Sequence, residues 1–492
     1  MDAPSQPRQR QFTRRSRAGC RTCRARHVKC DETPDTCQRC VASGLRCEYD
    51  LTRLPRPATG RALPRWPRPA AALPPGPGGG SVDERHCFAV FYHHTVPMMA
   101  SWFDSEVWQR LVLQMSHAEP AVYHAVVALS ALHEAAAAGA DGEVDGAADG
   151  AGRELALAGR SPHHRFALAQ YGRAMALLRA RLTSHDPLVR RLALTCCVVF
   201  GCFELFRGHS ETAFVHLQNG ARILVSQPHA LDPTGPEPAL AKVFVHLDLH
   251  SAQFSEGGPL LSLDAEAPGL EPIRSVADAK HQLDPIVNQI LRFRRAWESL
   301  RPEASLGVQE LAAGLAEQAR IQARLHGHQV AFEAFIAGAP PQALSPKDWR
   351  SADVIRMQHL GLANILDTGL VASEMVYDSC LPVYQAITCL AAQITRSFQT
   401  GPDGRRPNLV LDMGVIPSLF WVCLKCRDVP TRQRALDLLE AWPHREGAYD
   451  SVAMAPIARQ HMEREGHFLA GDAAGWVVPE SARMASLELG TI

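Results

Sequence analysis

The stretch that decides the fold is CRTCRARHVKC at residues 20–30, followed by CQRCVASGLRC at residues 37–47. Each segment has the spacing Cys-x2-Cys-x6-Cys, so three thiols occur twice in a short internal repeat. The x2 spacing places two thiolates on a single turn, and the x6 spacing adds a third about two helical turns later. Three sulfurs per repeat leave a tetrahedral zinc ion one ligand short. If each repeat shares one thiolate with the other, two zinc ions are each completed at four sulfurs.

The residues around the first repeat are strongly basic. Between Arg8 and Lys29 the chain has no Asp or Glu, and it carries Arg10, Arg14, Arg15, Arg17, Arg21, Arg24 and Arg26. Six thiolates and two zinc dications have a combined charge of about −2, and the positive charge of these arginines is larger in magnitude. The surplus positive charge is expected to face outward, where it suits the phosphates of a nucleic acid.

This stretch resembles the DNA-binding domain of the fungal C6 (binuclear) zinc cluster regulators. The resemblance is carried by CRARHVKCDE at 23–32, by a loop that contains Pro34, and by CEYD at 47–50. It implies two Zn²⁺ ions bridged by Cys20 and Cys37. One zinc would be held by Cys20, Cys23, Cys30 and Cys37, and the other by Cys37, Cys40, Cys47 and Cys20.

The same resemblance implies that the helix after Cys23 enters the major groove of double-stranded DNA and reads a CGG-type triplet. The base-reading positions match Arg26 and His27, and an arginine can donate two hydrogen bonds to guanine. His27 stands where the family often has Lys or Arg. The residues expected nearer to phosphates are Arg21, Arg24 and Lys29.

The cysteine repeat has two alternative interpretations. A disulfide-linked domain fits the number of cysteines, but the start of the sequence, MDAPSQPRQRQF, has no apolar run of the kind a signal peptide needs. Outside the secretory route, this pattern favours metal over disulfides. A zinc cluster that binds a protein partner, as part of an adaptor, is the second alternative to DNA binding.

The whole chain has 492 residues and a formal net charge of zero, with basic residues concentrated before residue 80. A basic head on an acidic body is typical of a tethered nucleic-acid reader. We find no run of about eighteen apolar residues and therefore predict no membrane span. The expected divisions are a disordered N-terminus (1–13), a C6 zinc cluster domain (14–50), a basic Pro/Gly-rich linker (51–82), an all-helical regulatory region (83–470) and a tail (471–492).

The region 83–470 has the periodicity of amphipathic helices. Apolar residues step by three and four at Leu168–Leu182, Leu188–Phe203 and Val308–Ala319, whereas strand-like alternation is scarce. Residues 135–161 contain few bulky apolar side chains and are expected to form a mobile insertion between helices. No heptad repeat follows the cysteines, so any dimer contact is expected from this helical region. The alternative is a monomer whose DNA binding is helped by the basic residues Arg53–Arg68.

The helical region resembles the regulatory region of the same fungal C6 regulators. The fragments that suggest this are EPAVYHAVVALSALHE (119–134), LALTCCVVFGCFELFRGHSETAFVHLQNGARIL (192–224), FVHLDLHSAQF (244–254) and LFWVCLKCRDVPTRQRALDLLEAWPHREGAYDS (419–451). The resemblance implies a scaffold for regulation and for homodimer contacts. It implies no catalytic residues.

Several isolated motifs fail as sites of catalysis or metal binding. Cys423 and Cys426 form a Cys-x2-Cys with no further ligands at suitable spacing, so we interpret them as core residues. The sequence His444-Arg445-Glu446 lacks the downstream Pro-Cys-x2-Cys that a zinc deaminase needs. An enzyme in the helical region is a third hypothesis, and no constellation of residues supports it.

The sequence therefore predicts a zinc-dependent, sequence-specific DNA-binding regulator of RNA polymerase II transcription that acts in the nucleus. A small zinc-stabilised domain of two short helices with loops is followed by a large all-α region. The expected partners are double-stranded DNA, the transcription machinery and a second copy of the chain bound through the helical region. The expected cofactors are two Zn²⁺ ions.

Overall fold

The protein is represented by a computed structural model, which describes residues 20–31, 37–47, 80–140, 162–184, 186, 188–226, 237–254, 258–261, 272–300, 307–340, 342–399, 406–466, 470–472 and 475–483. The chain forms two compact units, Met1–Pro64 and Arg65–Ile492. The first unit contains two short helices, α1 (Arg21–Ala25) and α2 (Gln38–Ala42), with a turn after each. Five of its six cysteines are buried, and they form its core.

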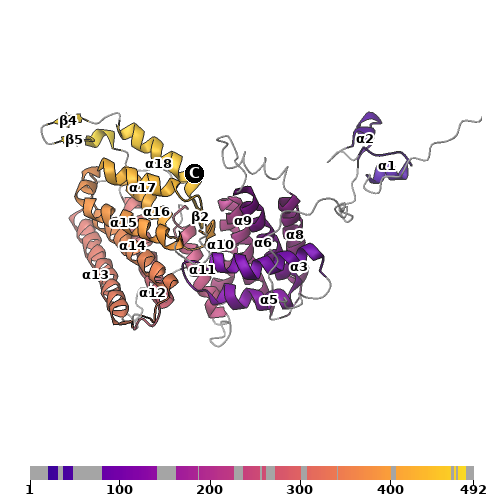
Figure 1. The fold of residues 1–492 in the computed structure, drawn as a ribbon, viewed down its shortest axis with the longest axis horizontal. Helices are drawn as coiled ribbons and strands as arrows, with labels where there is room; N and C mark the ends of the chain where they lie inside the picture. Colours follow the sequence, from indigo (N-terminus) through magenta and orange to yellow (C-terminus); the bar gives the residue numbers. More distant parts are fainter. Residues whose placement is uncertain are drawn as a thin grey trace, which may run out of the picture. The chain divides into compact units, whose positions relative to one another are not determined.

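The second unit is built almost entirely from helices (Figure 1). Its first half contains α3 (Val82–Val90), η1 (Phe91–Thr95), α4 (Val96–Met99), η2 (Val107–Leu111), α5 (Val112–Ala118), α6 (Pro120–Ala140), α8 (Pro162–Arg181), α9 (Leu188–Arg207), α10 (Ser210–Ser226) and α11 (Glu237–Ser251). Its second half contains α12 (Val276–Leu300), α13 (Val308–Gly338), α14 (Pro346–Gly369), η4 (Glu374–Cys380), α15 (Leu381–Gln399), α16 (Val415–Lys425), α17 (Val429–Glu440), α18 (Ser451–Gly466) and η5 (Glu480–Ala482). The predicted fold class, a cysteine-cluster domain followed by a large all-α region, is confirmed.

The first half of this unit packs around α6. Every residue of α6 from 121 to 134 is buried, in agreement with a sequence that is apolar on all sides, AVYHAVVALSALHE. Helices α8 and α9 lie against α6 and add Tyr171, Leu192 and Phe203 to the same core. Tyr171 and Phe203 stack with their ring centres 4.3 Å apart.

The second half has its own apolar core around α14 to α18. Trp102, from the turn after α4, is fully buried in this core and meets Phe398 and Trp442 edge to face. At the same place Leu411 belongs to the first core and Val410 to the second. The segments around Trp102 and Val410 therefore join the two halves into one unit.

The described strands are short, and one of them places the residue that caps the N-terminus of helix α16. β1 (Leu409–Val410) pairs in parallel with β2 (Arg445–Glu446), which pairs antiparallel with β3 (Tyr449–Asp450). The buried carboxylate of Glu446 accepts hydrogen bonds of 2.9 Å from the backbone N–H groups of Gly414, Val415 and Ile416. His444 Nε2 lies 3.0 Å from Glu446 Oε1. The His-x-Glu motif thus caps the N-terminus of α16 and has a structural role.

The end of the described chain packs onto the helical unit. Strands β4 (Ala470–Asp472) and β5 (Gly475–Val477) form a hairpin. Beyond it, the buried guanidinium of Arg483 donates to both carboxylate oxygens of Asp378, at 2.8 and 2.7 Å. The predicted tail of residues 471–492 therefore includes residues that belong to the packed unit.

The first residues of the expected insertion at 135–161 are helical. Helix α6 continues to Ala140, so residues 135–140 are helical. The reason is local, because alanine has the highest helix propensity and residues 135–138 are all alanine. Residues 141–161 lie outside the described part of the chain, as do residues 1–19 and 48–79, which include most of the expected linker.

The predicted faces of two helices are also corrected. In α13 the expected apolar face is exposed, with Val308, Leu311 and Leu315 accessible by 86, 41 and 50 %. The buried face instead runs through Gln318, Ile321, Leu325, His328, Phe332 and Ile336. Because Gln318 and His328 on this face are polar, the apolar periodicity of the buried face is not visible in the sequence. In α8 the expected Met175 is exposed, and small or polar residues such as Ala167 and Gln170 are buried in its place.

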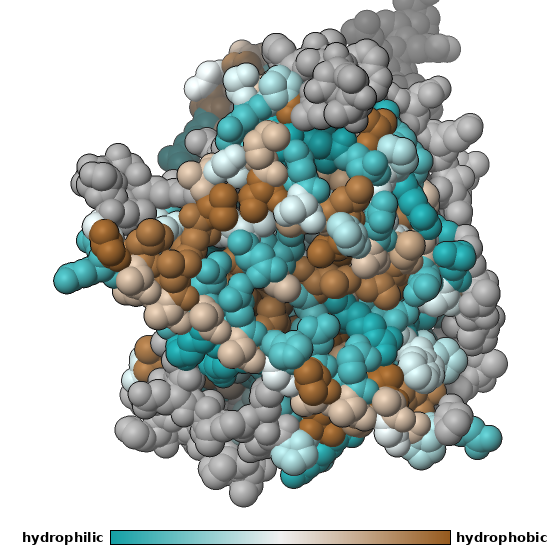
Figure 2. Space-filling view, turned by 90° about the vertical axis from the view of Figure 1, so that its left-hand side faces the viewer, coloured by the Kyte–Doolittle hydropathy of each residue, from teal (hydrophilic) through white to brown (hydrophobic). Residues whose placement is uncertain are grey.

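Apolar side chains are also found at the surface of the C-terminal half. Figure 2 faces the side of the molecule that lies at the left of Figure 1, and brown apolar groups are interrupted there by teal hydrophilic ones. Exposed apolar residues of this half include Val308, Trp349, Val371 and Met375. Scattered exposure of this kind is normal for a folded protein surface.

The close contact between α10 and α11 gives a testable prediction about packing. A Cβ on Gly220 would lie 2.1 Å from Phe244 Cε1, inside a closed core. We expect Gly220→Ala to lower the free energy of unfolding by about 1–2 kcal/mol because the helices must separate. Gly361→Ala in α14 is the matched control, since no atom lies within 4 Å of its Cβ position. There the helix propensity of alanine should raise stability by about 0.5–1 kcal/mol. Urea unfolding of both variants measures the difference, and equal effects would contradict the packing described here.

Candidate metal centre and nucleic-acid interface

The two cysteine repeats have the same local structure. The first cysteine of each repeat immediately precedes a short helix, α1 or α2. The backbone N–H of Cys23 donates to Cys20 Sγ, and that of Cys40 donates to Cys37 Sγ, both at 3.3 Å. The third cysteine of each repeat also accepts from the first, because Cys20 N–H lies 3.5 Å from the Cys30 sulfur and Cys37 N–H lies 3.3 Å from the Cys47 sulfur. The repeat in sequence is thus a repeat in structure.

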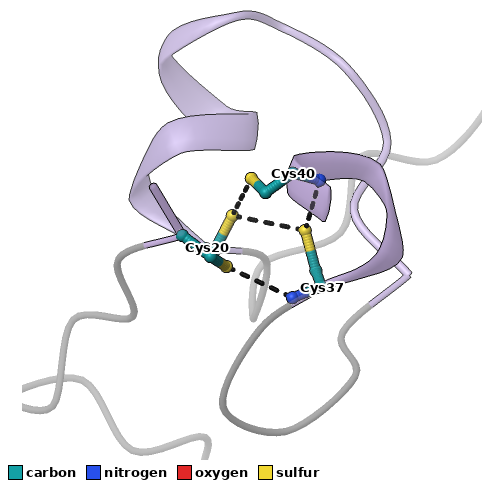
Figure 3. Close-up of side chains that lie close together, drawn as sticks. Cys20, Cys37 and Cys40 are labelled. Carbon is teal, nitrogen blue, oxygen red and sulfur yellow. Dashed lines mark hydrogen bonds between the residues drawn. The ribbon is translucent and has the colours of Figure 1, made fainter. Parts of the chain in front are cut away.

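The structure brings all six predicted cysteines together in two overlapping groups of four. Within each group the sulfurs lie within 4.8 Å of one another; the groups are Cys20, Cys23, Cys30 and Cys37, and Cys20, Cys37, Cys40 and Cys47. Cys20 and Cys37 are the two residues common to both. Their side chains point toward each other from the starts of the two helices, with Cys40 beside them (Figure 3).

The spacing of the sulfurs fits tetrahedral zinc. Cys20 Sγ lies 3.8 Å from Cys37 Sγ and 3.7 Å from Cys40 Sγ, and Cys23 Sγ lies 3.6 Å from Cys37 Sγ. Four sulfurs at about 2.3 Å from one zinc are separated by about 3.8 Å at the corners of a tetrahedron. These separations are far longer than the disulfide bond length of about 2.05 Å. The donor set and its spacing therefore suit metal and not cross-links.

The two shared cysteines differ electrostatically from their neighbours. Burial raises the pKa of Cys20 and of Cys37, but hydrogen bonds from backbone N–H groups and neighbouring thiols outweigh it and lower both pKa values. By contrast, burial and the hydrogen bonds with Cys37 and Cys20 raise the pKa of Cys23 to about 12. The thiolate form is therefore favoured most at the two positions that two metal ions would share.

Two hydrogen-bonded links hold the repeats against each other. The carboxylate of Asp31, at the end of the first repeat, accepts from the backbone N–H of Gln38 at 3.0 Å and of Arg39 at 3.3 Å. The hydroxyl of Thr22 donates to the carbonyl of Arg46 at 2.8 Å. These links were not predicted, because Asp31 lies seven residues before α2 and is not at its N-cap position. The loop around Pro34 lies outside the described residues.

The predicted DNA-contacting residues lie beside this centre, but not on a helix that follows Cys23. Cys23 lies within α1, which ends at Ala25, and Arg26 and His27 form the turn after it. The structure ends the helix there because His27 has a φ of 54°, the left-handed conformation that terminates helices. Arg26, His27 and Lys29 are all exposed. Arg21 and Arg24 lie in α1, and their side chains fall outside the described part of the structure.

The second Cys-x2-Cys has the properties of core residues. Cys423 and Cys426, at the end of α16, are both buried. Burial raises the pKa of Cys423 to about 12 and that of Cys426 to about 11. In the described ranges, the only groups of at least three Cys, His, Asp or Glu side chains close enough to share an ion are the two cysteine groups above. Within those same ranges, no helix is both long and apolar enough to cross a membrane.

Comparison with known proteins agrees with this geometry. Residues 18–55 match the fungal Zn(2)-Cys(6) binuclear cluster domain, and residues 86–287 match the fungal specific transcription factor domain. A zinc-binding cysteine cluster in front of such a helical region defines a class of transcription regulators, not of enzymes. In both segments the chain is therefore similar to fungal Zn(2)-Cys(6) transcription regulators.

Proteins with similar sequences are named as transcription regulators or transcription factors. The aspercryptin biosynthesis cluster-specific transcription regulator atnN of Emericella nidulans is 23 % identical over 92 % of this chain and 87 % of its own. The Zn(2)-C6 fungal-type transcription factor afumD of Aspergillus fumigatus is 35 % identical, over 24 % of this chain and 33 % of its own. The transcription regulator lscL of Purpureocillium lilacinum is 27 % identical over 41 % of this chain and 47 % of its own. No solved structure matches the chain.

Proposed function

We propose that the six cysteines hold two Zn²⁺ ions. Cys20, Cys23, Cys30 and Cys37 bind one ion, and Cys20, Cys37, Cys40 and Cys47 bind the other. The support for this assignment is the overlap of the two sulfur groups at Cys20 and Cys37. Zinc supplies no chemistry to a substrate here; it fixes the fold of a domain that has almost no apolar core of its own.

We further propose that this centre presents a DNA-reading segment. The residues between Cys23 and Cys30 are tied to the metal centre at both ends, and they carry the exposed side chains of Arg26, His27 and Lys29. This arrangement supports the proposal more than any other observation, because it places three basic side chains on a short, fixed segment. Phosphate contacts fix position, and base contacts give sequence specificity.

Within this segment the residues take different roles. Arg26 and His27 face the base edges of a CGG-type triplet in the major groove, where an arginine can donate two hydrogen bonds to guanine O6 and N7. Lys29, Arg21 and Arg24 bind phosphates. The turn at His27 separates Arg26 from Lys29, and this change of backbone direction supports the division between base reading and phosphate binding.

The helical unit acts as a regulatory and dimer-forming region. One triplet specifies too few base pairs to select a site among about 10⁶–10⁹ genomic competitors. Two copies of the chain that read two triplets remove this difficulty, and the spacing of the triplets follows from the dimer. The protein works in the nucleus, where it controls RNA polymerase II genes through contacts with the transcription machinery. The sequence divisions 14–50, 51–82 and 83–470 remain our domain assignment.

A binding titration with the zinc-loaded full chain tests the proposed function. Labelled duplexes carry two CGG triplets, one triplet, or the same bases in permuted order. We expect the two-triplet duplex to bind most tightly, by at least about tenfold over the single-triplet duplex, and a chelator to abolish the preference. Sedimentation of the protein should show a dimer. A monomer that binds one and two triplets equally would refute the dimer, and equal binding to permuted DNA would favour a protein-binding adaptor.

A further inference from the structure

A cavity of about 450 Å³ lies within the helical unit. It is lined by α4 and the turn after it, η2, α11, α12 and the residues that follow β1. These segments are far apart in the sequence and meet where the two apolar cores of the unit adjoin. The apolar part of the lining includes Met99, Phe103, Val107, Trp108, Val243 and Leu247. Cavities of about 300–1,000 Å³ with mostly apolar walls are typical of small-molecule sites.

A chain of charged and polar side chains also lines this cavity. The ammonium of Lys280 is bonded to the carboxylate of Asp284, one turn further along α12. Lys280 Nζ also lies 3.2 Å from His246 Nδ1, on α11. The other ring nitrogen of His246 is 2.7 Å from Asp412 Oδ1, just beyond β1. Four polar residues from three segments thus form one connected row, Asp284, Lys280, His246 and Asp412.

The burial of this row indicates a role other than stability. Lys280 and Asp284 are only 5 and 3 % exposed. Replacement of such a buried ion pair by apolar residues is often neutral or stabilising, so the pair is weak evidence for a stabilising function. Burial and Lys280 lower the pKa of His246, yet Asp412 and Asp284 outweigh them and raise it. Charged groups with shifted pKa values at a cavity wall are typical of binding sites.

The hydrogen-bonding capacity of the row is only partly used. An ammonium group has three donors, and Lys280 directs two of them at Asp284 and His246. Asp412 contacts His246 through Oδ1, and its Oδ2 accepts no hydrogen bond from the residues that the structure describes. One donor and one acceptor therefore remain at the cavity wall. A hydroxyl group can donate its hydrogen to the Asp412 oxygen.

The charges around the cavity favour an uncharged occupant. Among its acidic lining residues, Asp104 is paired with Lys347 at 2.6 Å, and Glu106 lies 3.6 Å from Arg110. The remaining formal charges of the lining, Lys242 and Lys280 against Asp284 and Asp412, are balanced. A charged ligand would add a net charge to this balanced lining, and the free-energy cost of removing that charge from water would not be compensated.

We propose that this cavity binds a small uncharged molecule with an aromatic or aliphatic body and a hydroxyl group. The body lies against Trp108, Val107 and Leu247, and the hydroxyl donates a hydrogen bond to Asp412. This proposal does not depend on the proposed DNA binding, and the experiments below test it independently.

Calorimetric titration of the full chain with 2-naphthol, naphthalene and 2-naphthoate tests the proposal. These probes share one apolar body and differ in the polar group. We expect 2-naphthol to bind at least tenfold more tightly than naphthalene, because naphthalene cannot make the hydrogen bond to a charged side chain. Equal binding of 2-naphthol and naphthalene, tighter binding of 2-naphthoate, or no binding of any probe at about 1 mM would each overturn the proposal.

Two variants locate the binding within the cavity. Ala277, on the α12 side of the lining, becomes phenylalanine in Ala277→Phe, which fills the space and should abolish 2-naphthol binding. Ala312→Phe, at an exposed position of α13, is the matched control and should leave binding unchanged. Undiminished binding in Ala277→Phe would overturn the location.

Asp412→Asn provides a test that does not depend on a bulky substitution. The asparagine oxygen can keep the position of Asp412 Oδ1 beside His246 Nε2, and its amide then presents a donor to the cavity where the carboxylate presented an acceptor. We expect 2-naphthol affinity to fall about tenfold and 2-acetonaphthone, which only accepts, to bind more tightly than it does to the natural protein. Unchanged preference between these two probes would contradict the role of Asp412.

Discussion

Removal of zinc by a chelator is expected to unfold the cysteine-rich unit and to leave the helical unit folded. The core of the first unit is made of cysteine side chains, whereas its apolar residues Val28, Val41 and Leu45 are 40, 65 and 43 % exposed. Little hydrophobic burial is therefore available to offset the conformational entropy lost on folding. Metal binding must supply the difference, and structural zinc sites of this kind contribute about 10–16 kcal/mol.

Amide NMR spectra of the full chain follow this change. With a chelator, or at acidic pH where thiolates bind protons, signals from residues 20–47 should collapse to positions typical of an unfolded chain. Signals from α3 to α18 should keep their dispersion. A cysteine-rich unit that stays folded after the metal has been removed would contradict the account.

Single cysteine replacements separate shared ligands from unshared ones. Cys20→Ser or Cys37→Ser should disturb both metal ions, because these sulfurs belong to both groups of four. Cys47→Ser should disturb mainly one ion. Cys389→Ser is the matched control, since Cys389 is exposed on α15 and outside the cluster. Native mass spectrometry counts the ions, and a single zinc in the natural protein would exclude the two-ion assignment.

Arg26→Ala is expected to have the largest effect on sequence discrimination. Loss of a two-hydrogen-bond contact with guanine should cost about 1–3 kcal/mol of affinity for the CGG-type site and much less for permuted DNA. Arg26 is exposed and makes its only described hydrogen bond through the backbone, so the substitution should leave the metal centre intact. Zinc content, measured on the same sample, checks this point.

Lys29→Ala is the comparison within the same segment. It should weaken binding to all DNA sequences about equally and lower the slope of log affinity against log salt by about one. Arg320→Ala, at an exposed position of α13, should change neither property. If Arg26→Ala weakens cognate and permuted DNA to the same extent, Arg26 binds phosphate and does not read bases.

The cysteine groups could be predicted closely because metal ligands are specific residue types at short, fixed spacings. The overlap at Cys20 and Cys37 follows from the family resemblance, and the geometry agrees with it. The end of α1 at Ala25 could not be predicted in this way. It depends on the left-handed backbone of His27, a conformation that a sequence pattern does not reveal for a residue other than glycine.

The helical unit shows the limits of periodicity more clearly. The positions of helices were predictable, but the buried face of α13 was not, because Gln318 and His328 lie on it and Val308 lies off it. Likewise, the local sequence does not predict that Trp102 lies in the core of the second half, or that Glu446 caps α16. Such contacts depend on which segments meet in three dimensions. The cavity at Lys280 and Asp412 is of the same kind.

The measurement that tests the central claim most directly is selection of bound sites from random duplex DNA by the full chain, with zinc and with a chelator. The account predicts that zinc-loaded protein enriches CGG-type triplets and that chelated protein enriches nothing. It also predicts that Arg26→Ala loses the enrichment while keeping its zinc. Zinc-loaded natural protein that recovers random sequences would contradict the claim that this cluster reads DNA.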